Sequence, residues 1–303
     1  MVVTADSSIF KPQLRHPVRT IGARTFDFDR QVAVMAVVNR TPDSFYDQGR
    51  TFALDRAVSA ALAAVAEQAD WVDIGGVPFS PDTPEVSAAE EIDRVVPVIE
   101  AVAARSDVVI SVDTFRADVA ARAIAAGAAV INDTTGLHDP GLAEVVADSA
   151  ATLVICHSLA APRTPYPRPE YDDVVAEIVA FLNTRIELAL RSGVPEERIV
   201  IDPGHDLNKN TFHTLELTRR LSAISAIGLP LLAAVSNKDF VGEAIGRPKE
   251  ERLEGSLAAA TFCILQGARI VRMHNVAAAV NAVRMTEAML GFRQPAYVFH
   301  NMT

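Results

Sequence analysis

The residues of this chain with the most chemical potential are polar or ionisable side chains that follow short apolar runs. Four of them combine hydrogen-bond acceptors with donors, namely Asp113, Asn132, Asp202 and Lys238. Such a set suits the edge of a flat heterocycle, where ring nitrogens and substituents alternate between donors and acceptors. Three more suit an oxyanion, namely Asn39, Arg272 and His274. Because an arginine can also lie flat on a ring, the residue types predict an aromatic heterocycle joined to a phosphate group.

Eight apolar runs precede these polar residues, and the stretches between the runs have helical spacing. The runs are Val32–Val38, Trp71–Ile74, Val108–Val112, Ala128–Ile131, Thr152–Cys156, Ile199–Ile201, Leu231–Val235 and Ile270–Met273. Continuous apolar runs without alternation are typical of parallel strands buried on both faces. Between two of them, Asp139 and Pro140 predict a helix start with an Asp N-cap and Pro at the first helical position.

Strands alternating with helices over 303 residues, without a linker-like break, predict a single closed (β/α)8 barrel of the TIM type. A doubly wound open sheet is the alternative. That fold usually has a Gly-rich phosphate turn after its first strand, whereas the turn here reads Asn39-Arg-Thr-Pro-Asp-Ser-Phe. Residues 1–31 are expected to be an N-terminal extension, in which residues 20–31 form a hairpin that closes the barrel bottom. The barrel is expected over residues 32–293, and a loose tail over 294–303.

In such a barrel, chemistry belongs at the C-terminal ends of the strands. The polar residues at the eight ends are, in order, Asn39, Asp73 with Gly75-Gly76, Asp113, Asn132 with Asp133, His157, Asp202, Ser236 with Lys238, and Arg272 with His274. Each one alone has a structural explanation: Asp73 caps the following turn, and His157 is a barrel-top histidine with satisfied hydrogen bonds. The whole set is not required for folding, and burying so many charges is costly unless each has a partner.

Composition narrows the classes of partner. The formal net charge of −10 argues against a nucleic-acid or anionic-membrane surface, both of which need basic patches. Cys156 and Cys263 lie far apart in apolar stretches, as expected for buried thiols in a reducing compartment. Neither a signal-peptide core nor a run of about 20 apolar residues is present. We therefore expect a cytoplasmic protein.

The motifs at the strand ends resemble those of the dihydropteroate synthase family from about residue 32 onward. They are, in family order, Val37-Val38-Asn39-Arg40-Thr41-Pro42-Asp43-Ser44-Phe45, Asp73-Ile74-Gly75-Gly76, Ser111-Val112-Asp113-Thr114, Ile131-Asn132-Asp133, His157, Asp202-Pro203-Gly204, Ser236-Asn237-Lys238 and Arg272-Met273-His274. Each motif is weak alone, but their order and spacing together are specific. The resemblance is strongest to the divergent second copy that some bacteria carry beside a normal synthase.

The resemblance implies a transfer reaction of folate biosynthesis, in which p-aminobenzoate displaces pyrophosphate from 6-hydroxymethyl-dihydropterin diphosphate. It assigns to the pterin the residues Asp113, Asn132, Asp202, Lys238 and Arg272. It also implies that Arg272 and His274 bind the leaving diphosphate and, with Lys238, form the catalytic set. Asn39 would help to hold Mg2+ against the diphosphate. A homodimer is the family expectation.

Four departures from the family pattern fall in the loops. Ser80 replaces an arginine of the second-strand loop, and Asn237 replaces the arginine of the Ser-Arg-Lys motif. The family's Gly-Phe-Gly-Lys becomes Asp206-Leu207-Asn208-Lys209, and Asn275 replaces an acid. Arg40 is an added cation beside Asn39. The pterin-facing positions are kept, so the pattern predicts a homologue with weak or absent synthase activity.

Three alternatives follow from these departures. The chain is a working synthase in which Arg40 compensates, a pterin-binding protein without turnover, or a pterin-dependent methyltransferase on a related barrel. The Ser-x-Lys and Arg-x-His motifs favour the synthase family over the methyltransferase.

Overall fold

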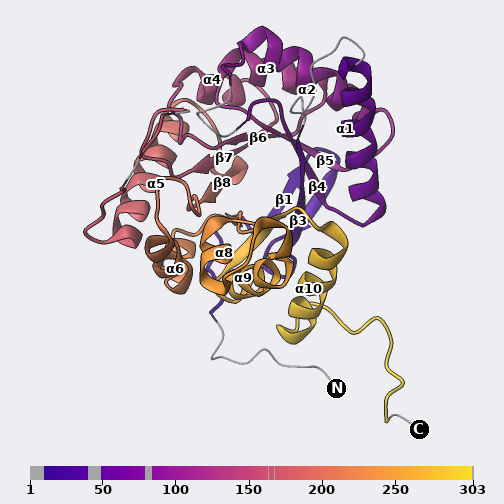
Figure 1. Cartoon of the computed structure of the whole chain (residues 1–303), viewed down its shortest axis with the longest axis vertical. Helices are drawn as coiled ribbons and strands as arrows, with labels where there is room; N and C mark the ends of the chain where they lie inside the picture. Colours follow the sequence, from indigo (N-terminus) through magenta and orange to yellow (C-terminus); the bar gives the residue numbers. More distant parts are fainter. Residues whose placement is uncertain (1–9, 40–48, 79–83, 163, 167, 302–303) are drawn as a thin grey trace.

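The computed structural model describes residues 10–39, 49–78, 84–162, 164–166 and 168–301 of the chain. Eight parallel strands close into a barrel in the order β10-β3-β4-β5-β6-β7-β8-β9, ringed by helices (Figure 1). The strands are β3 (Ala33–Asn39), β4 (Trp71–Gly75), β5 (Val109–Asp113), β6 (Val130–Asp133), β7 (Thr152–Cys156), β8 (Ile199–Asp202), β9 (Leu231–Ala233) and β10 (Ala268–Met273). The pairing of β10 with β3 closes the sheet. This closure confirms the predicted TIM barrel and excludes the open sheet.

The predicted strand bounds are correct at β7 and shifted elsewhere. Strand β6 begins two residues later than predicted, because Gly127 has a φ of 117° and the Ala128 N–H still bonds to Ala123 at the end of the preceding helix. Strand β9 ends at Ala233, two residues earlier than predicted. Strand β8 extends through Asp202, which places that carboxylate on the strand itself.

The helices cover the outside of the barrel. They are α1 (Gly49–Ala66), α2 (Ala88–Ala103), α3 (Ala117–Ala126), α4 (Gly141–Ala147), α5 (Val174–Arg191), α6 (Thr211–Arg219), α7 (Leu221–Ser225), α8 (Asp239–Ile245), α9 (Leu253–Leu265) and α10 (Val276–Met289), with short 3-10 turns η1 (Glu196–Arg198) and η2 (Lys249–Glu251). No helix in the described part of the chain is long and apolar enough to cross a membrane.

The predicted start of α4 is wrong by one residue. Pro140 is the N-cap, and Gly141 is the first helical residue. Asp139 Oδ1 accepts from the Gly141 N–H, while its Oδ2 accepts from the Ala117 N–H at the start of α3. The carboxylate therefore serves two helix starts, a geometry that sequence spacing does not reveal.

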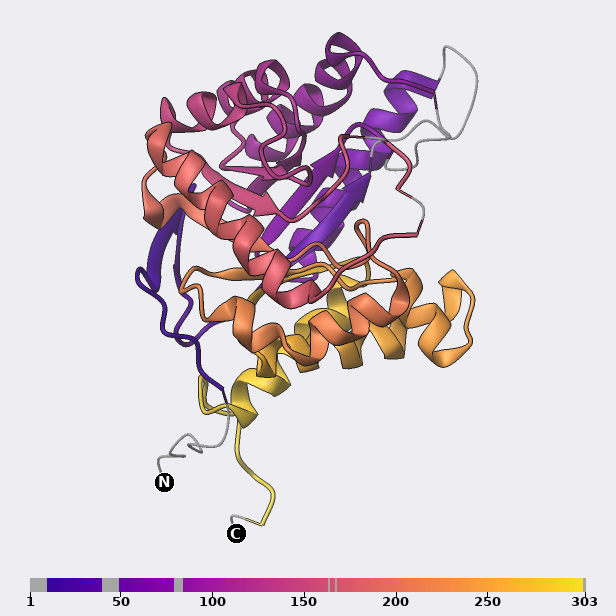
Figure 2. The same ribbon diagram turned by 90° about the vertical axis from the view of Figure 1, so that its left-hand side faces the viewer.

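An antiparallel hairpin of β1 (Val18–Ile21) and β2 (Arg24–Asp27) lies at the N-terminal end of the barrel strands. Phe26 packs edge-on to Trp71 of β4 at 6.0 Å between ring centroids, within a buried apolar cluster that includes residues from all eight barrel strands. Figure 2 shows the hairpin in indigo at one end of the barrel, opposite the pink segment that follows β7. With this end filled by apolar side chains, the C-terminal strand ends are the open face.

Candidate functional site

Asp73 is the centre of the polar network at the C-terminal strand ends. It lies on β4 and is fully buried. It accepts hydrogen bonds from Ser111 Oγ at 2.6 Å, Asn132 Nδ2 at 3.1 Å and Arg272 Nε at 2.7 Å. The structural explanation that Asp73 caps the turn after its strand is therefore wrong. Its carboxylate instead fixes side chains from three other strands.

Arg272 is held as a fixed cation between two carboxylates. Besides its bond to Asp73, its Nη2 lies 3.6 Å from Asp113 Oδ2. Burial lowers the pKa of Arg272, but the negative charges of Asp73 and Asp113 raise it by more than burial lowers it. The pKa of Arg272 is therefore above its ordinary value. Burial raises the pKa of Asp113 to about 7, as does Asp73, while Arg272 opposes both.

Asn132 and Asp202 supply buried acceptors to the same site. Asn132 Oδ1 is buried and has no hydrogen-bond partner in the described part of the chain. Asp202 Oδ1 accepts from the Gly204 N–H at 2.7 Å. Burial raises the pKa of Asp202, and the Gly204 N–H, Lys238, Lys209 and Arg272 counter this shift. A buried acceptor without a partner is costly, which makes Asn132 Oδ1 a position where a ligand N–H is stabilising.

Lys238 stands at the start of α8 and is half-buried. Its charge lowers the pKa of Asp202. Its ammonium donates to none of the residues that the structure describes, so its donors are available to a ligand. Asn237, which precedes it, has a φ of 57°, and its N–H donates to Ser256 Oγ at 3.0 Å. Asn tolerates this left-handed conformation better than most residues.

His274 is held by Ser236. Ser236 Oγ lies 3.0 Å from His274 Nδ1 and accepts from the His274 backbone N–H at 3.1 Å. Burial lowers the pKa of His274 to about 4, and the charges of Arg272, Lys249 and Lys238 add to this. The imidazole is therefore neutral near pH 7. Since the Ser236 hydroxyl can donate to Nδ1, the proton belongs on Nε2, where it is a neutral donor.

Asn39 is the last residue of β3 and pairs in register with Gly75 of β4. Its side chain lies outside the described set, as do Arg40 and Ser80 in full. Within the described ranges, no three His, Cys, Asp or Glu side chains lie together as metal ligands would.

His157 belongs to the loop scaffold and does not join the Asp73 network. Lys209 Nζ lies 2.9 Å from His157 Nδ1 and donates to the carbonyls of Gly204 at 2.9 Å and Leu207 at 3.0 Å. Burial lowers the pKa of Lys209 to about 7. It also lowers the pKa of His157 to about 2, with Lys209 adding to the effect. Three acceptors match the three N–H groups of an ammonium, so Lys209 ties together the loop after β8.

Two residues of the same loop other than glycine have the left-handed backbone conformation that favours glycine. Asp206 has a φ of 64° and Asn208 a φ of 51°. Asn208 Oδ1 accepts from Ser158 Oγ at 2.9 Å, the Leu159 N–H at 2.9 Å and the Ala160 N–H at 3.1 Å. The side chain that replaced a glycine therefore joins the loop after β8 to the segment after β7. The replacement is visible in the sequence, whereas the connection it makes is not.

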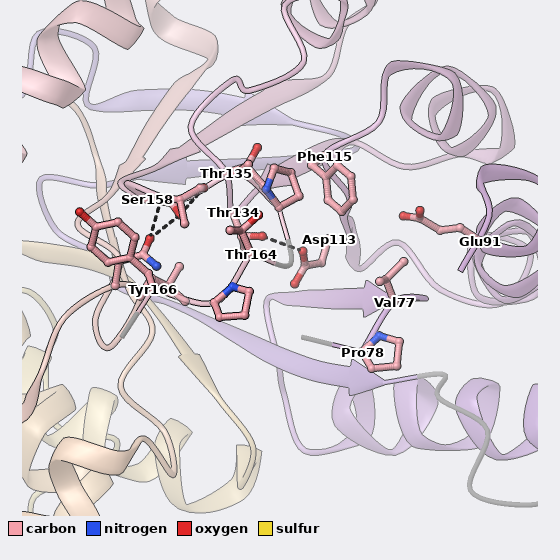
Figure 3. A pocket seen from close by; sticks show the side chains of 16 residues that line it. Val77, Pro78, Glu91, Asp113, Phe115, Thr134, Thr135, Ser158, Thr164 and Tyr166 are labelled. Atoms are coloured by element: carbon pink, nitrogen blue, oxygen red, sulfur yellow. Dashed lines mark hydrogen bonds between the residues drawn. The ribbon is translucent and has the colours of Figure 1, made fainter. Parts of the chain in front are cut away.

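A pocket of about 250 Å³ opens beside Asp113 (Figure 3). Its lining comes from the segments that follow β4 to β8 and from α2. The described lining residues are Val77, Pro78, Glu91, Asp113, Phe115, Thr134, Thr135, Ser158, Ala160, Ala161, Pro162, Thr164, Pro165, Tyr166, Leu207 and Asn208. The Asp113 carboxylate is thus shared between the Asp73 network and this pocket.

Comparisons with known proteins agree with this geometry. The sequence pattern of the family described as pterin binding enzyme matches residues 35–274. The chain belongs to this family. It is 45% identical to the protein named inactive dihydropteroate synthase 2 of Mycobacterium tuberculosis, over 91% of this chain and 88% of that one. It is 38% identical to the dihydropteroate synthase of Escherichia coli, over 86% of this chain and 93% of that one.

A solved structure gives the same result for the fold. The dihydropteroate synthase of Xanthomonas albilineans in complex with 7,8-dihydropteroate superposes with a TM-score of 0.79 at 37% identity. The match covers 90% of this chain and 97% of the other. The family resemblance inferred from the strand-end motifs is therefore confirmed.

Proposed function

We propose that this barrel binds a pterin ring among Asp113, Asn132, Asp202, Lys238 and Arg272. The observation that carries the proposal is the buried, unpartnered Asn132 Oδ1 beside the buried carboxylate of Asp202. Both acceptors suit the ring N–H and amino groups of a pterin, and Asp202 can accept two of them in a charge-assisted pair. Lys238 offers donors on the same side, and the fixed guanidinium of Arg272 suits the ring face.

We infer that synthase activity is weak or absent. Arg272, Lys238 and His274 are the residues proposed to stabilise a departing diphosphate. His274 is kept from the family motif, so the inference rests on the two positions where a cation is replaced. Ser80 and Asn237 stand where the family carries arginine, and neither brings a charge. Loss of one donor to developing negative charge commonly costs about a hundred- to a thousand-fold in rate. The name of the Mycobacterium tuberculosis relative agrees with this inference.

Mg2+ and a homodimer belong to the proposal as family expectations. The metal would lie against a diphosphate near Asn39, and p-aminobenzoate would be the second ligand if turnover survives. Both expectations rest on the family resemblance, and the pterin-binding proposal does not depend on them.

Calorimetric titration of the full chain with unsubstituted pterin tests the pterin site. Asp202→Ala should weaken binding at least about a hundredfold, because it removes a charge-assisted pair of hydrogen bonds. Asp172→Ala, at an exposed carboxylate beyond the lining of the pocket, is the matched control and should bind like the unmodified chain. If Asp202→Ala folds and binds pterin as well as this control, the pocket assignment is wrong.

A further inference from the structure

We propose that Asp206 is a positioning residue for Lys238. Its carboxylate caps α8 from the neighbouring loop, so that Lys238 can begin this helix and keep its ammonium free for a ligand. The inference rests on the proposed function, since it concerns how a pterin-binding lysine is held. It adds a residue that lies outside the set proposed to touch the ring.

Lys238 is poorly suited to begin a helix. It is the N-cap of α8, with an extended backbone (φ −67°, ψ 157°), and its side chain makes no capping hydrogen bond. The preferred N-cap residues are Ser, Thr, Asp and Asn, because a side-chain oxygen accepts from an N–H of the first turn. An ammonium carries donors only. Lysine therefore cannot supply the acceptor, and the first turn of α8 needs one from elsewhere.

Asp206 supplies this acceptor from the loop after β8. Its Oδ2 accepts from the Phe240 N–H at 3.2 Å, across 34 positions of sequence. Phe240 is the second residue of α8, and the N–H at this place is one that a capping oxygen normally takes. A negative charge is also favourable at the start of a helix. The carboxylate therefore does for α8 what the side chain of its own N-cap residue cannot do.

The loop after β8 holds Asp206 against α8. Its backbone has a φ of 64°, and its N–H donates to Thr214 Oγ1 of α6 at 3.3 Å. The ring of the preceding residue, His205, is buried and stacks on the ring of Phe240, with 6.1 Å between the centroids. Two successive side chains thus contact the first turn of α8. Glycine, which the family motif has at position 206, carries no side chain that could cap the helix.

The other side of the same segment is held by Arg252, the N-cap of α9. Its Nη1 donates to the carbonyls of Asn237 at 3.0 Å and Lys238 at 3.1 Å. The guanidinium lies against Gly242, where it leaves no room for a Cβ. The backbone at Lys238 is therefore held between two elements, and Asp206 provides the contact from the β8 side. If the first turn of α8 frays, fewer chains present Lys238 to the ring, and the apparent affinity falls by that fraction.

Two substitutions of Asp206 test the cap by calorimetric titration with unsubstituted pterin. Asp206→Gly fits the positive φ and removes only the carboxylate, so affinity should fall about fivefold, the usual size of a lost cap. Asp206→Asn also tolerates this φ and offers an amide oxygen to the Phe240 N–H. It should bind within about twofold of the unmodified chain. Equal affinities in the two variants would overturn the proposal.

A double-mutant cycle with Lys238→Met separates positioning from a general loss of structure, because methionine keeps the stem and removes the ammonium. If Asp206 acts through Lys238, adding Asp206→Gly to Lys238→Met should change pterin affinity by about twofold or less. If the fivefold loss persists in this background, Asp206 acts on the site by another route and the proposal fails.

Hydrogen exchange of the Phe240 amide gives a readout that needs no ligand. Asp206→Gly should speed this exchange about fivefold. Asn208→Gly is the matched control: Asn208 lies in the same loop with a φ of 51°, but its side chain bonds to the segment after β7. It should leave exchange at Phe240 unchanged. Unchanged exchange in Asp206→Gly would show that Asp206 does not cap α8.

The two readouts distinguish this inference from the proposed function. If the folded, unmodified chain does not bind pterin, the proposed function fails, and exchange at Phe240 still decides whether the cap exists. If pterin binds and Asp206→Gly speeds exchange without weakening binding, the positioning role is overturned and the pterin site stands.

Discussion

The floor and the rim of the barrel mouth differ in how their side chains are held. We use floor for Asp73, Asn132, Asp202 and Arg272, which lie on strands, and rim for the loops that follow the strands. Asp73 alone bonds to side chains 38, 59 and 199 positions away in the sequence. The four departures from the family motifs named above, by contrast, follow the strands in sequence and belong to the rim. Arg272 and Lys238 are proposed to serve both the ring and the leaving group, whereas the lost cations at positions 80 and 237 would have served the leaving group alone. Ring binding can therefore be kept while leaving-group chemistry is lost.

The largest effect that we expect is on the rate of pyrophosphate release, when cations are restored to the rim. Ser80→Arg combined with Asn237→Arg should raise pyrophosphate release by about a hundredfold if lost cations explain the deficit. Asn237 has a φ of 57°, where arginine is strained by roughly 1 kcal/mol. Ser80→Arg alone adds one cation without that strain, so it is the control for a loss of stability caused by Asn237→Arg. The measurement is steady-state pyrophosphate release with both substrates. No gain in a folded double variant would assign the deficit to loop geometry.

Disturbing the floor should have a smaller effect, and on binding rather than turnover. Asp73→Asn removes the charge that orients Arg272 and Asn132, and we expect pterin affinity to fall about tenfold. Ser111→Ala deletes only one of the hydrogen bonds to Asp73 and should change affinity by about twofold or less. Titration of both variants, with thermal unfolding as a folding check, measures the difference. If the two variants lose the same amount of pterin affinity, Asp73 does not position Arg272 and Asn132.

The last effect concerns stability rather than ligand binding or turnover. The pKa of Asp113 is raised to about 7 by burial and by Asp73, whereas an unfolded Asp titrates at about 3.9. Between these two values the folded chain holds a proton that the unfolded chain has released. Stability must therefore fall as pH rises through this window. The free energy of unfolding of Asp113→Asn, relative to that of the unmodified chain, should rise by on the order of 1–3 kcal/mol from pH 5 to pH 8. Urea unfolding of both proteins at the two pH values measures this rise. If the variant and the unmodified chain differ in free energy of unfolding by the same amount at pH 5 and at pH 8, the prediction is refuted.

The sequence was sufficient to predict the barrel because its strands are continuous apolar runs that match parallel strands buried on both faces. It also predicted which strand ends carry polar groups. It did not reveal that Asp73 bonds to Ser111, Asn132 and Arg272, since these contacts join distant positions through barrel closure. Nor did it show that Asn208 binds the segment after β7. Side-chain partners across loops depend on backbone conformation, here a positive φ, which residue types alone do not specify.

The most direct test of the central claim measures chemistry and binding on one sample of the full chain. Pyrophosphate release is followed with dihydropterin diphosphate, p-aminobenzoate and Mg2+ beside the Escherichia coli synthase, and pterin binding is titrated in parallel. Our account predicts pterin binding with turnover more than about a thousandfold below that control, given two missing donors. Turnover within about a hundredfold of the control, dependent on p-aminobenzoate, would contradict it and show that the rim still supports the reaction.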